Sequence, residues 1–168
     1  MINPHLIKPA GLTWFIRRIF ITAILATLLL SSSAQSKYVT KYRPIADSLS
    51  AEYGIPTAII LGIAILESGS GTSRNAKLLN NHFGIAGKNK LLKTKGVRSR
   101  YKQYFSVKAS YVDFCMLLSK RKYYKRLKGT KDYRPWVEAI AKAGYSEAPA
   151  EWKKRITATI KKNKLAAQ

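Results

Sequence analysis

The sequence has few acidic residues and almost no cysteine or histidine. It contains 8 Asp and Glu against 31 Lys and Arg, with one cysteine and two histidines in 168 residues. A single cysteine excludes an internal disulfide, and Cys115 lies in an apolar stretch that predicts a buried structural thiol. The histidines and the cysteine show no metal-ligand spacing. Neither a metal nor another cofactor is therefore expected.

The first 34 residues are typical of a secretory signal peptide. Arg17 and Arg18 precede an apolar run over residues 19–30, and the small residues of "SSSAQ" follow it. The run is shorter than the roughly 20 residues that a membrane-spanning helix needs; an uncleaved N-terminal anchor is the alternative. We therefore expect a single domain over residues 35–168, exported to the periplasm or cell envelope or secreted.

The net charge of +23 implies a polyanionic partner. For an exported protein, cell-wall polymers with peptide and lactyl carboxylates, or anionic lipid head groups, are more accessible than nucleic acid, which ranks last. The charge thus predicts attraction to polyanionic surfaces of the cell envelope. Protein partners and oligomeric state are left open by the sequence.

Apolar spacing predicts a mainly helical domain. A first amphipathic helix runs through residues 38–49 and ends before Gly54, and a second runs from Pro56 to Glu67. The second helix is apolar on every side, which predicts a central, buried position. Further helices are predicted over residues 73–79, 107–122, 135–143 and 149–162.

The segment "FGIAGKNKLLKTKGVRSRYKQYF" (83–105) differs from the rest of the chain. It contains three glycines and seven basic residues, no acidic residue, and no clear helical period. We expect a basic loop or short β-hairpin lobe on the helical body.

Glu67 ends the apolar helix and is followed by glycine and serine residues in "ESGSG". It lies over Ile63 and Ala64, one turn back, so burial favours its neutral form. The negative end of the helix dipole has the same effect. Both raise the pKa, which suits a general acid near neutral pH, and Gly69 permits the left-handed conformation that ends the helix. A solvated helix-end residue, or an ion pair with an arginine, is the alternative from these residues alone.

Three motifs follow one another along the chain. An apolar helix ending in "ESG" is followed by Ser73 and by "NNHFGIAG" at residues 80–87, and "YKQYFSVKAS" and "AGYSEAP" come later. This order resembles the bacterial endo-β-N-acetylglucosaminidases of glycoside hydrolase family 73, over about residues 37–163. The resemblance implies a lysozyme-like helical domain, and a peptidoglycan hydrolase that cleaves the β-1,4 bond between N-acetylglucosamine and N-acetylmuramic acid of the glycan strands.

The resemblance also implies roles for single residues. Glu67 would be the general acid that protonates the glycosidic oxygen. The candidates for substrate binding are Asn80, Asn81, Phe83, Tyr101, Tyr104 and Tyr145. The alternatives are a core position for Phe83 and a capping or turn role for the asparagines. His82 occupies a variable position of the motif and is predicted to be a partly exposed loop residue.

The sequence departs from the family at the second carboxylate. Residues 83–105 contain no Asp or Glu, and the Glu of the family's Tyr-x-Ser-x-x-Glu-Ser segment is Ala109 here. Three routes remain. The 2-acetamido group of the substrate attacks the anomeric carbon, or Asp113 acts as a base, or Glu67 works alone as acid and then base in lytic transglycosylase chemistry. We favour substrate assistance, with Glu67 as the only catalytic carboxylate.

A non-catalytic basic module that binds the cell wall is the rival hypothesis. The run "SKRKYYKRLKGTKDYRPW" (119–136) interleaves basic and aromatic residues, as a groove for nucleic acid or glycan does. The alternative is a helix end whose long basic side chains extend into solvent along their apolar stems.

Overall fold

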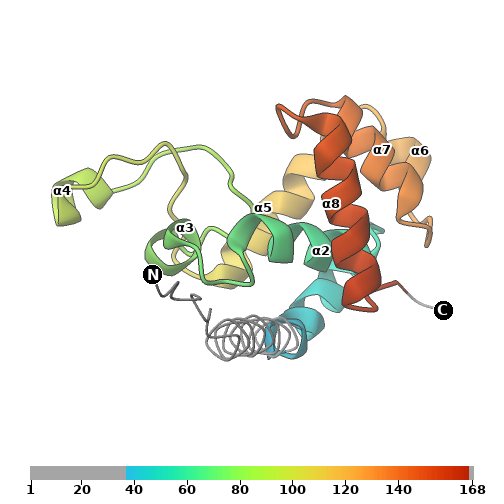
Figure 1. Ribbon diagram of the computed structural model, residues 1–168, viewed down its shortest axis with the longest axis horizontal. Coiled ribbons are helices and arrows are strands. Elements are labelled where there is room, and N and C mark those ends of the chain that lie inside the picture. Colours follow the sequence, from blue (N-terminus) through green and yellow to red (C-terminus); the bar gives the residue numbers. More distant parts are fainter. Residues whose placement is uncertain (1–36, 167–168) are drawn as a thin grey trace, which may run out of the picture. The chain divides into compact units, whose positions relative to one another are not determined.

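The first helix described runs over residues 37–53, and its inner face carries Tyr38, Ala46 and Leu49. The computed structural model describes residues 37–166, which Figure 1 shows as a mainly helical domain. These residues belong to one unit, Gln35–Gln168. The predicted signal peptide lies outside the described residues and stays a prediction.

The second helix, α2 (Thr57–Ser68), forms the centre of the core, and nine of its 12 residues are buried. A helix that is apolar on every side is stable only when other elements cover it, as the sequence predicted. Gly69 ends the helix with φ 56° and ψ 48°, the left-handed conformation expected there. Within residues 37–166, no helix is both long and apolar enough to cross a membrane.

The last helix, α8 (Pro149–Lys162), crosses α2 (Figure 1), and the two helices approach closely at Gly62. A Cβ atom added to Gly62 would lie 2.8 Å from Cγ1 of Ile160 and 3.2 Å from Cδ1 of Ile156. A larger residue at this position would push the two helices apart. The close approach at Gly62 fixes the position of α8 on α2, and with it the position of the first turn of α8 beside the last turn of α2.

Five further helices lie within the described part of the chain. In chain order they are α3 (Arg74–Leu79), α4 (Leu91–Lys95), α5 (Val107–Ser119), α6 (Tyr124–Leu127) and α7 (Arg134–Lys142). The sequence predicted α3, α5 and α7, although α5 ends at Ser119, three residues before the predicted end. It missed α4 and α6, because helices of five and four residues show too little of the 3.6-residue period to be detected.

Residues 84–103 form a segment that we call the arm, which reaches away from the other helices and carries α4 at its end (Figure 1). Its two sides are joined by backbone hydrogen bonds from Gly87 to Arg100 at 2.9 Å and from Lys102 to Ile85 at 2.8 Å. Only one isolated β-bridge joins them within the described residues. The predicted basic loop or hairpin is therefore a hairpin-like arm without a regular β-ladder.

Asn81 closes the root of the arm. Its Nδ2 donates to the carbonyl groups of Ile85 and Lys102, both at 2.8 Å. Its Oδ1 accepts from the backbone N–H groups of Phe83 at 3.3 Å and Ile85 at 3.2 Å. The residue is 1% exposed, so these four bonds satisfy a buried amide and fix both ends of the arm.

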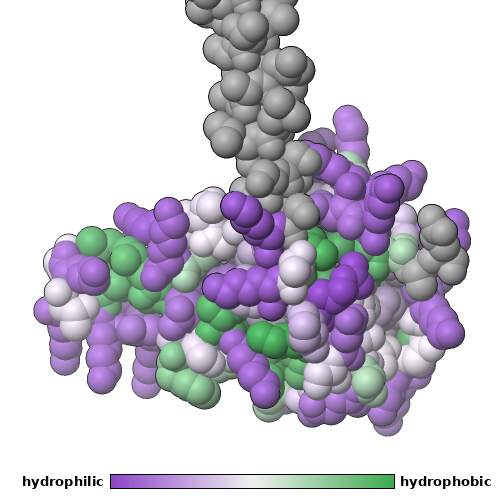
Figure 2. Space-filling view, turned by 90° about the horizontal axis from the view of Figure 1, so that it is seen from below, coloured by the Kyte–Doolittle hydropathy of each residue, from purple (hydrophilic) through white to green (hydrophobic). Residues whose placement is uncertain are grey.

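Asn89 joins the two sides of the arm further out. Its Nδ2 donates to the carbonyl groups of Ser99 at 2.8 Å and Tyr101 at 2.9 Å, and its Oδ1 accepts from the N–H of Leu91 at 3.0 Å. Hydrophilic side chains project into solvent from the end of the domain where α4 lies (Figure 2). The arm is thus held by hydrogen bonds more than by apolar packing.

Candidate active site

The carboxyl group of Glu67 lies in the last turn of α2, where three elements meet. Its Oε1 accepts from the indole Nε1 of Trp152, in the first turn of α8, at 3.0 Å. Its Oε2 lies 3.9 Å from the position that a Cβ atom on Gly84 would take, and Cε1 of Tyr101 lies 3.9 Å from that same position. Helix α2, helix α8 and the root of the arm therefore converge on Glu67.

Ser68 fixes the turn that follows Glu67. Its Oγ donates to the carbonyl of Ala64 at 2.6 Å and accepts from the N–H of Gly71 at 2.8 Å. The side chain is fully buried. The last helical turn is therefore tied to the chain reversal, and the direction in which Glu67 projects is set by backbone rather than by a mobile loop.

Tyr145 supports the site from the loop before α8. Its hydroxyl donates to the carbonyl of Phe83 at 2.9 Å, and its ring centroid lies 5.5 Å from that of Trp152. Burial and the nearby Glu67 carboxylate raise the pKa of Tyr145 well above its ordinary value of 10. The hydroxyl therefore keeps its proton, and the ring holds Trp152 beside Glu67.

The pKa of Glu67 is raised, as the sequence predicted. Burial raises it, while the hydrogen bond from Trp152 and the charge of Arg155 lower it. Glu67 nevertheless keeps exposed surface. Glu67 is thus accessible to water and substrate, while the surrounding elements desolvate its carboxyl group in part. A raised pKa together with access from solvent is what a general acid requires.

Asn81 and Phe83 support this site from behind. They are 1% and 2% exposed, and the ring of Phe83 stacks on that of Phe114 with centroids 4.2 Å apart. Their burial favours a role in supporting the floor of the site over direct contact with a sugar; their assignment to substrate binding stays a prediction. Asn80 takes a left-handed turn at the end of α3, with φ 52°, and donates to the carbonyl of Tyr104 at 3.1 Å. Phe83 thus has the core position, and Asn80 the turn role, that were raised as alternatives for these residues.

Tyr101 and Tyr104 have different surroundings. Tyr101 is half-buried beside Glu67 and Gly84, and the guanidinium of Arg100 lies 5.4 Å from its ring centroid. Tyr104 is buried, and its hydroxyl donates to Oδ2 of Asp113 at 2.7 Å. Tyr101 therefore remains a candidate for substrate contact, whereas the hydroxyl of Tyr104 is already engaged.

Asp113, the candidate second carboxylate, is held by two donors. Lys102 Nζ and the Tyr104 hydroxyl both lie 2.7 Å from Oδ2. Burial raises the pKa of Asp113, but these two hydrogen bonds outweigh burial and lower it. A carboxylate with a lowered pKa is a weaker base. The prediction that Asp113 activates water therefore gains no support from its surroundings.

Comparison with known proteins places the chain in a family. A family model described as "Glucosaminidase: Mannosyl-glycoprotein endo-beta-N-acetylglucosaminidase" matches residues 43–165. The chain belongs to this glucosaminidase family. The match confirms the family that the order of motifs predicted, and with it a glycoside hydrolase domain. A comparison with curated proteins gave no match.

Three solved structures illustrate the fold of this glucosaminidase domain. The catalytic domain of the autolysin Auto from Listeria monocytogenes is 21% identical, with a TM-score of 0.65, over 79% of this chain and 86% of that one. A peptidoglycan hydrolase from Sphingomonas sp. A1 is 23% identical, with a TM-score of 0.62, over 77% and 90%. The glycoside hydrolase domain of FlgJ from Salmonella typhimurium is 23% identical, with a TM-score of 0.60, over 77% and 88%. The predicted mainly helical, lysozyme-like fold is confirmed.

His82 corrects a prediction within the glucosaminidase motif. It was expected to be partly exposed but is only 3% exposed. Its Nδ1 lies 2.6 Å from the hydroxyl of Tyr38, which in turn lies 2.8 Å from that of Tyr111. The two tyrosines supply the polar partners that allow an imidazole to be buried. Burial, assisted by the charge of Lys41, lowers the pKa of His82 to about 4, so the ring is neutral.

Trp152 belongs to this site although no sequence motif indicated it. In α8 it precedes the buried Ile156 and Ile160 by four and eight residues, so all three lie on one face of the helix. That face covers α2, and the spacing continues the apolar stripe to the end of α2 where Glu67 lies. The apolar spacing of α8 was therefore the sequence feature that could have placed Trp152 near Glu67. Arg155, whose charge lowers the pKa of Glu67, lies on the same helix.

Among the aromatic residues of the basic run 119–136, Trp136 belongs to the core, and Tyr123, Tyr124 and Tyr133 are half-buried against it. Trp136 is fully buried, and the ring centroids of Tyr123 and Tyr124 each lie 6.2 Å from its own. The hydroxyl of Tyr124 donates to the carbonyl of Tyr53 at 2.6 Å. These rings pack at least in part against the core, which weakens the hypothesis of a non-catalytic binding module.

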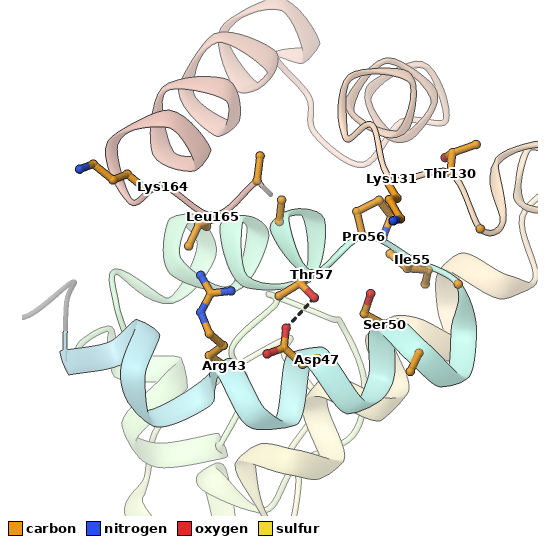
Figure 3. Close-up of a pocket in the computed structure, with 15 residues that line it drawn as sticks. Arg43, Asp47, Ser50, Ile55, Pro56, Thr57, Thr130, Lys131, Lys164 and Leu165 are labelled. Carbon is orange, nitrogen blue, oxygen red and sulfur yellow. Dashed lines mark hydrogen bonds between the residues drawn. The ribbon is translucent and has the colours of Figure 1, made fainter. Parts of the chain in front are cut away.

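A cavity of about 530 Å³ lies at the other end of α2 (Figure 3). Its one carboxylate, Asp47, accepts from the hydroxyl of Thr57 at 2.8 Å, and Arg43 and Lys131 also line it. The rise of α2 separates Thr57 from Glu67 by about 15 Å. This cavity is therefore distinct from the candidate active site. Within residues 37–166, no group of three or more His, Cys, Asp and Glu residues could hold a metal ion.

Proposed function

We propose that the protein hydrolyses the β-1,4 bond between N-acetylglucosamine and N-acetylmuramic acid in peptidoglycan, with Glu67 as the general acid. The observation that carries this proposal is the surroundings of Glu67 within a glucosaminidase domain. The carboxyl group is accessible, its pKa is raised, and Trp152 orients it. The relatives named as an autolysin and as a peptidoglycan hydrolase support the choice of polymer.

The proposed reaction uses one carboxyl group and the substrate's own acetamido group. The acetamido oxygen of the N-acetylglucosamine attacks its anomeric carbon, while Glu67 gives its proton to the departing oxygen of the muramic residue. Water then opens the cyclic oxazolinium intermediate, and the Glu67 carboxylate takes the proton of that water. The engagement of Asp113 by Lys102 and Tyr104 favours this route over a second carboxylate.

The test compares the protein with Glu67→Gln on purified peptidoglycan. Removing the proton donor is expected to lower the initial rate about 100-fold or more. The unfolding temperature should stay within a few degrees, because the amide keeps the shape and can still accept from Trp152. The matched control is Glu52→Gln, which makes the same substitution at an exposed position on the first helix. Cleavage by Glu67→Gln at the wild-type rate would contradict the assignment.

Mass spectrometry of the products tests the bond and the chemistry. Hydrolysis adds one water per cut and leaves a reducing N-acetylglucosamine. A reducing muramic acid would contradict the proposed bond. A product without added water would mean lytic transglycosylation, in which the muramic 6-hydroxyl replaces the water and Glu67 acts alone. Binding without any cut, abolished by salt, would mean a non-catalytic wall-binding module.

We further propose that the enzyme acts in the periplasm or at the cell envelope. The order of charged, apolar and small residues in the first 34 positions supports export, and the excess of lysine and arginine supports attraction to envelope polyanions. Fractionation of cells that express the protein with and without residues 1–34 tests the location. Binding of Glu67→Gln to purified cell walls should weaken as salt rises; binding that is insensitive to salt would contradict the electrostatic part.

A further inference from the structure

A second hollow lies between the base of the arm and the outer face of α5. Its volume is about 650 Å³, and its lining includes Phe105, Val112 and Met116 together with Lys102, Lys108 and Asp113. None of these residues belongs to the group around Glu67. The hollow is therefore a separate feature that the proposed reaction does not use.

The apolar part of this hollow is unusually open to solvent. Phe105 is 92% exposed and Met116 is 39% exposed; among the residues that the structure describes, the one other exposed large hydrophobic is Leu92 at 52%. Two of the three exposed large hydrophobic residues, Phe105 and Met116, thus line one hollow. Exposed apolar side chains that gather at a concave surface mark a binding site more often than single exposed ones do.

The charge around the hollow is positive. Asp113, the one acidic residue of the lining, is neutralised by Lys102 at 2.7 Å. Lys108 is exposed and takes part in none of the ion pairs found among residues 37–166. The hollow therefore offers apolar surface beside an available cation, a combination that suits a ligand with both methyl groups and carboxylates.

The hollow is connected with the candidate active site through one chain segment. Tyr101 lies beside Glu67, and Phe105 follows four residues later. Four residues span at most about 14 Å. A ligand in the hollow is thus close enough to be part of a substrate whose scissile bond lies at Glu67.

We propose that this hollow binds the stem peptide that branches from the muramic residues of peptidoglycan. The inference rests on the proposed function and names the part of the polymer that the enzyme recognises besides the glycan strand. Stem peptides carry alanine methyl groups and free carboxylates, which match Phe105 and Lys108. Because the peptide is tethered to the bound glycan, a weak contact gains from a high effective concentration. A partner protein would lack this advantage, and the sugar backbone has fewer carboxylates to offer.

The test uses soluble glycan strands with stem peptides and the same strands after an amidase has removed the peptides. The wild-type protein should cut the peptide-bearing strands about tenfold faster, the effect of one partly buried aromatic ring. Phe105→Ser and Lys108→Glu should bring this ratio close to one. The matched controls are Leu92→Ser, which removes another exposed large apolar side chain, on α4, and Lys125→Glu, the same charge reversal on α6. Both variants should keep the wild-type ratio.

A binding measurement separates the inference from the proposed function. Glu67→Gln, labelled for nuclear magnetic resonance, is titrated with a soluble muropeptide, and the amide signals of residues 104–109 should shift. A muropeptide that leaves these signals unchanged, or a wild-type ratio that Phe105→Ser and Lys108→Glu leave unaltered, overturns the inference. If neither strand is cut, the proposed function fails, and the titration still decides whether the peptide occupies the hollow.

Discussion

Helix α2 and the arm are held in opposite ways. Nine of the 12 residues of α2 are buried, and α8 crosses it closely at Gly62. The arm has one isolated β-bridge within the described residues and relies on the side-chain amides of Asn81 and Asn89. The two regions meet at Glu67. The difference places the proposed proton donor at the end of a closely packed helix and leaves the neighbouring surface to a segment held mainly by hydrogen bonds.

The arrangement separates two demands on the enzyme. Proton transfer requires the donor to be fixed within a fraction of an ångström, which the packing of α2 provides. Contact with a long, variable polymer tolerates movement, which the hydrogen-bonded arm permits. Each prediction below changes one side of this comparison.

The largest effect is expected from matched valine substitutions at two glycines. A Cβ atom at Gly62 would lie 2.8 Å from Cγ1 of Ile160, and one at Gly87 would lie 2.9 Å from Cβ of Lys102. Gly62→Val should destabilise the protein by about 3 kcal/mol, because two packed helices cannot separate without leaving voids. Gly87→Val should cost less than about 1 kcal/mol, because the arm can shift. Urea denaturation measures both; equal losses would contradict the contrast in rigidity.

The next effect concerns His82, between the two regions. Its pKa is about 4 in the folded protein against an ordinary 6.5. The stability that neutral His82 contributes is fully present above pH 6.5 and is lost as the pH falls toward 4, on the order of 3 kcal/mol. His82→Gln keeps a polar partner for Tyr38 but does not titrate. Its free energy of unfolding should therefore fall less than that of the wild type between pH 6.5 and 4; parallel curves would contradict the assignment.

A smaller effect is expected from Trp152→Phe. The variant keeps most of the apolar volume but removes the N–H that donates to Glu67 at 3.0 Å. That hydrogen bond lowers the pKa of Glu67, so its loss should raise the pKa further. The high-pH limb of the rate profile on peptidoglycan should then move to higher pH, because a general acid acts only while protonated. A limb that stays in place, or moves to lower pH, would show that Trp152 does not set this pKa.

The smallest effect on global stability is expected from Asn89→Ala. The change removes two hydrogen bonds that join the two sides of the arm and a local one from the N–H of Leu91. Amide hydrogen exchange should accelerate within residues 86–101, while the unfolding temperature shifts by only about 1–2 °C. Asn163→Ala, which removes a single side-chain bond at the end of α8, is the control. A large fall in unfolding temperature would mean that the arm is part of the cooperative core.

The sequence predicted the body of the protein better than the arm. Gly69 and the apolar run before it predicted where α2 ends and why Glu67 has a raised pKa, because burial and chain reversal are local properties. Helix α4 was missed because five residues carry almost no periodic signal. The partners of His82 and Asp113 were also missed. Tyr38 and Tyr111 lie 44 and 29 positions from His82, so the contacts depend on how the helices assemble.

The four hydrogen bonds of Asn81 have a consequence for how such an enzyme can change during evolution. They close the chain between Ile85 and Lys102, so the backbone beside Glu67 does not depend on the residues that lie beyond this closure. Insertions, deletions and charge changes in residues 88–99 can therefore accumulate without moving the proton donor. The root of the arm therefore stays the same while residues 88–99 are exchanged. Such exchanges offer a route to glucosaminidases that act on cell walls with different chemical modifications.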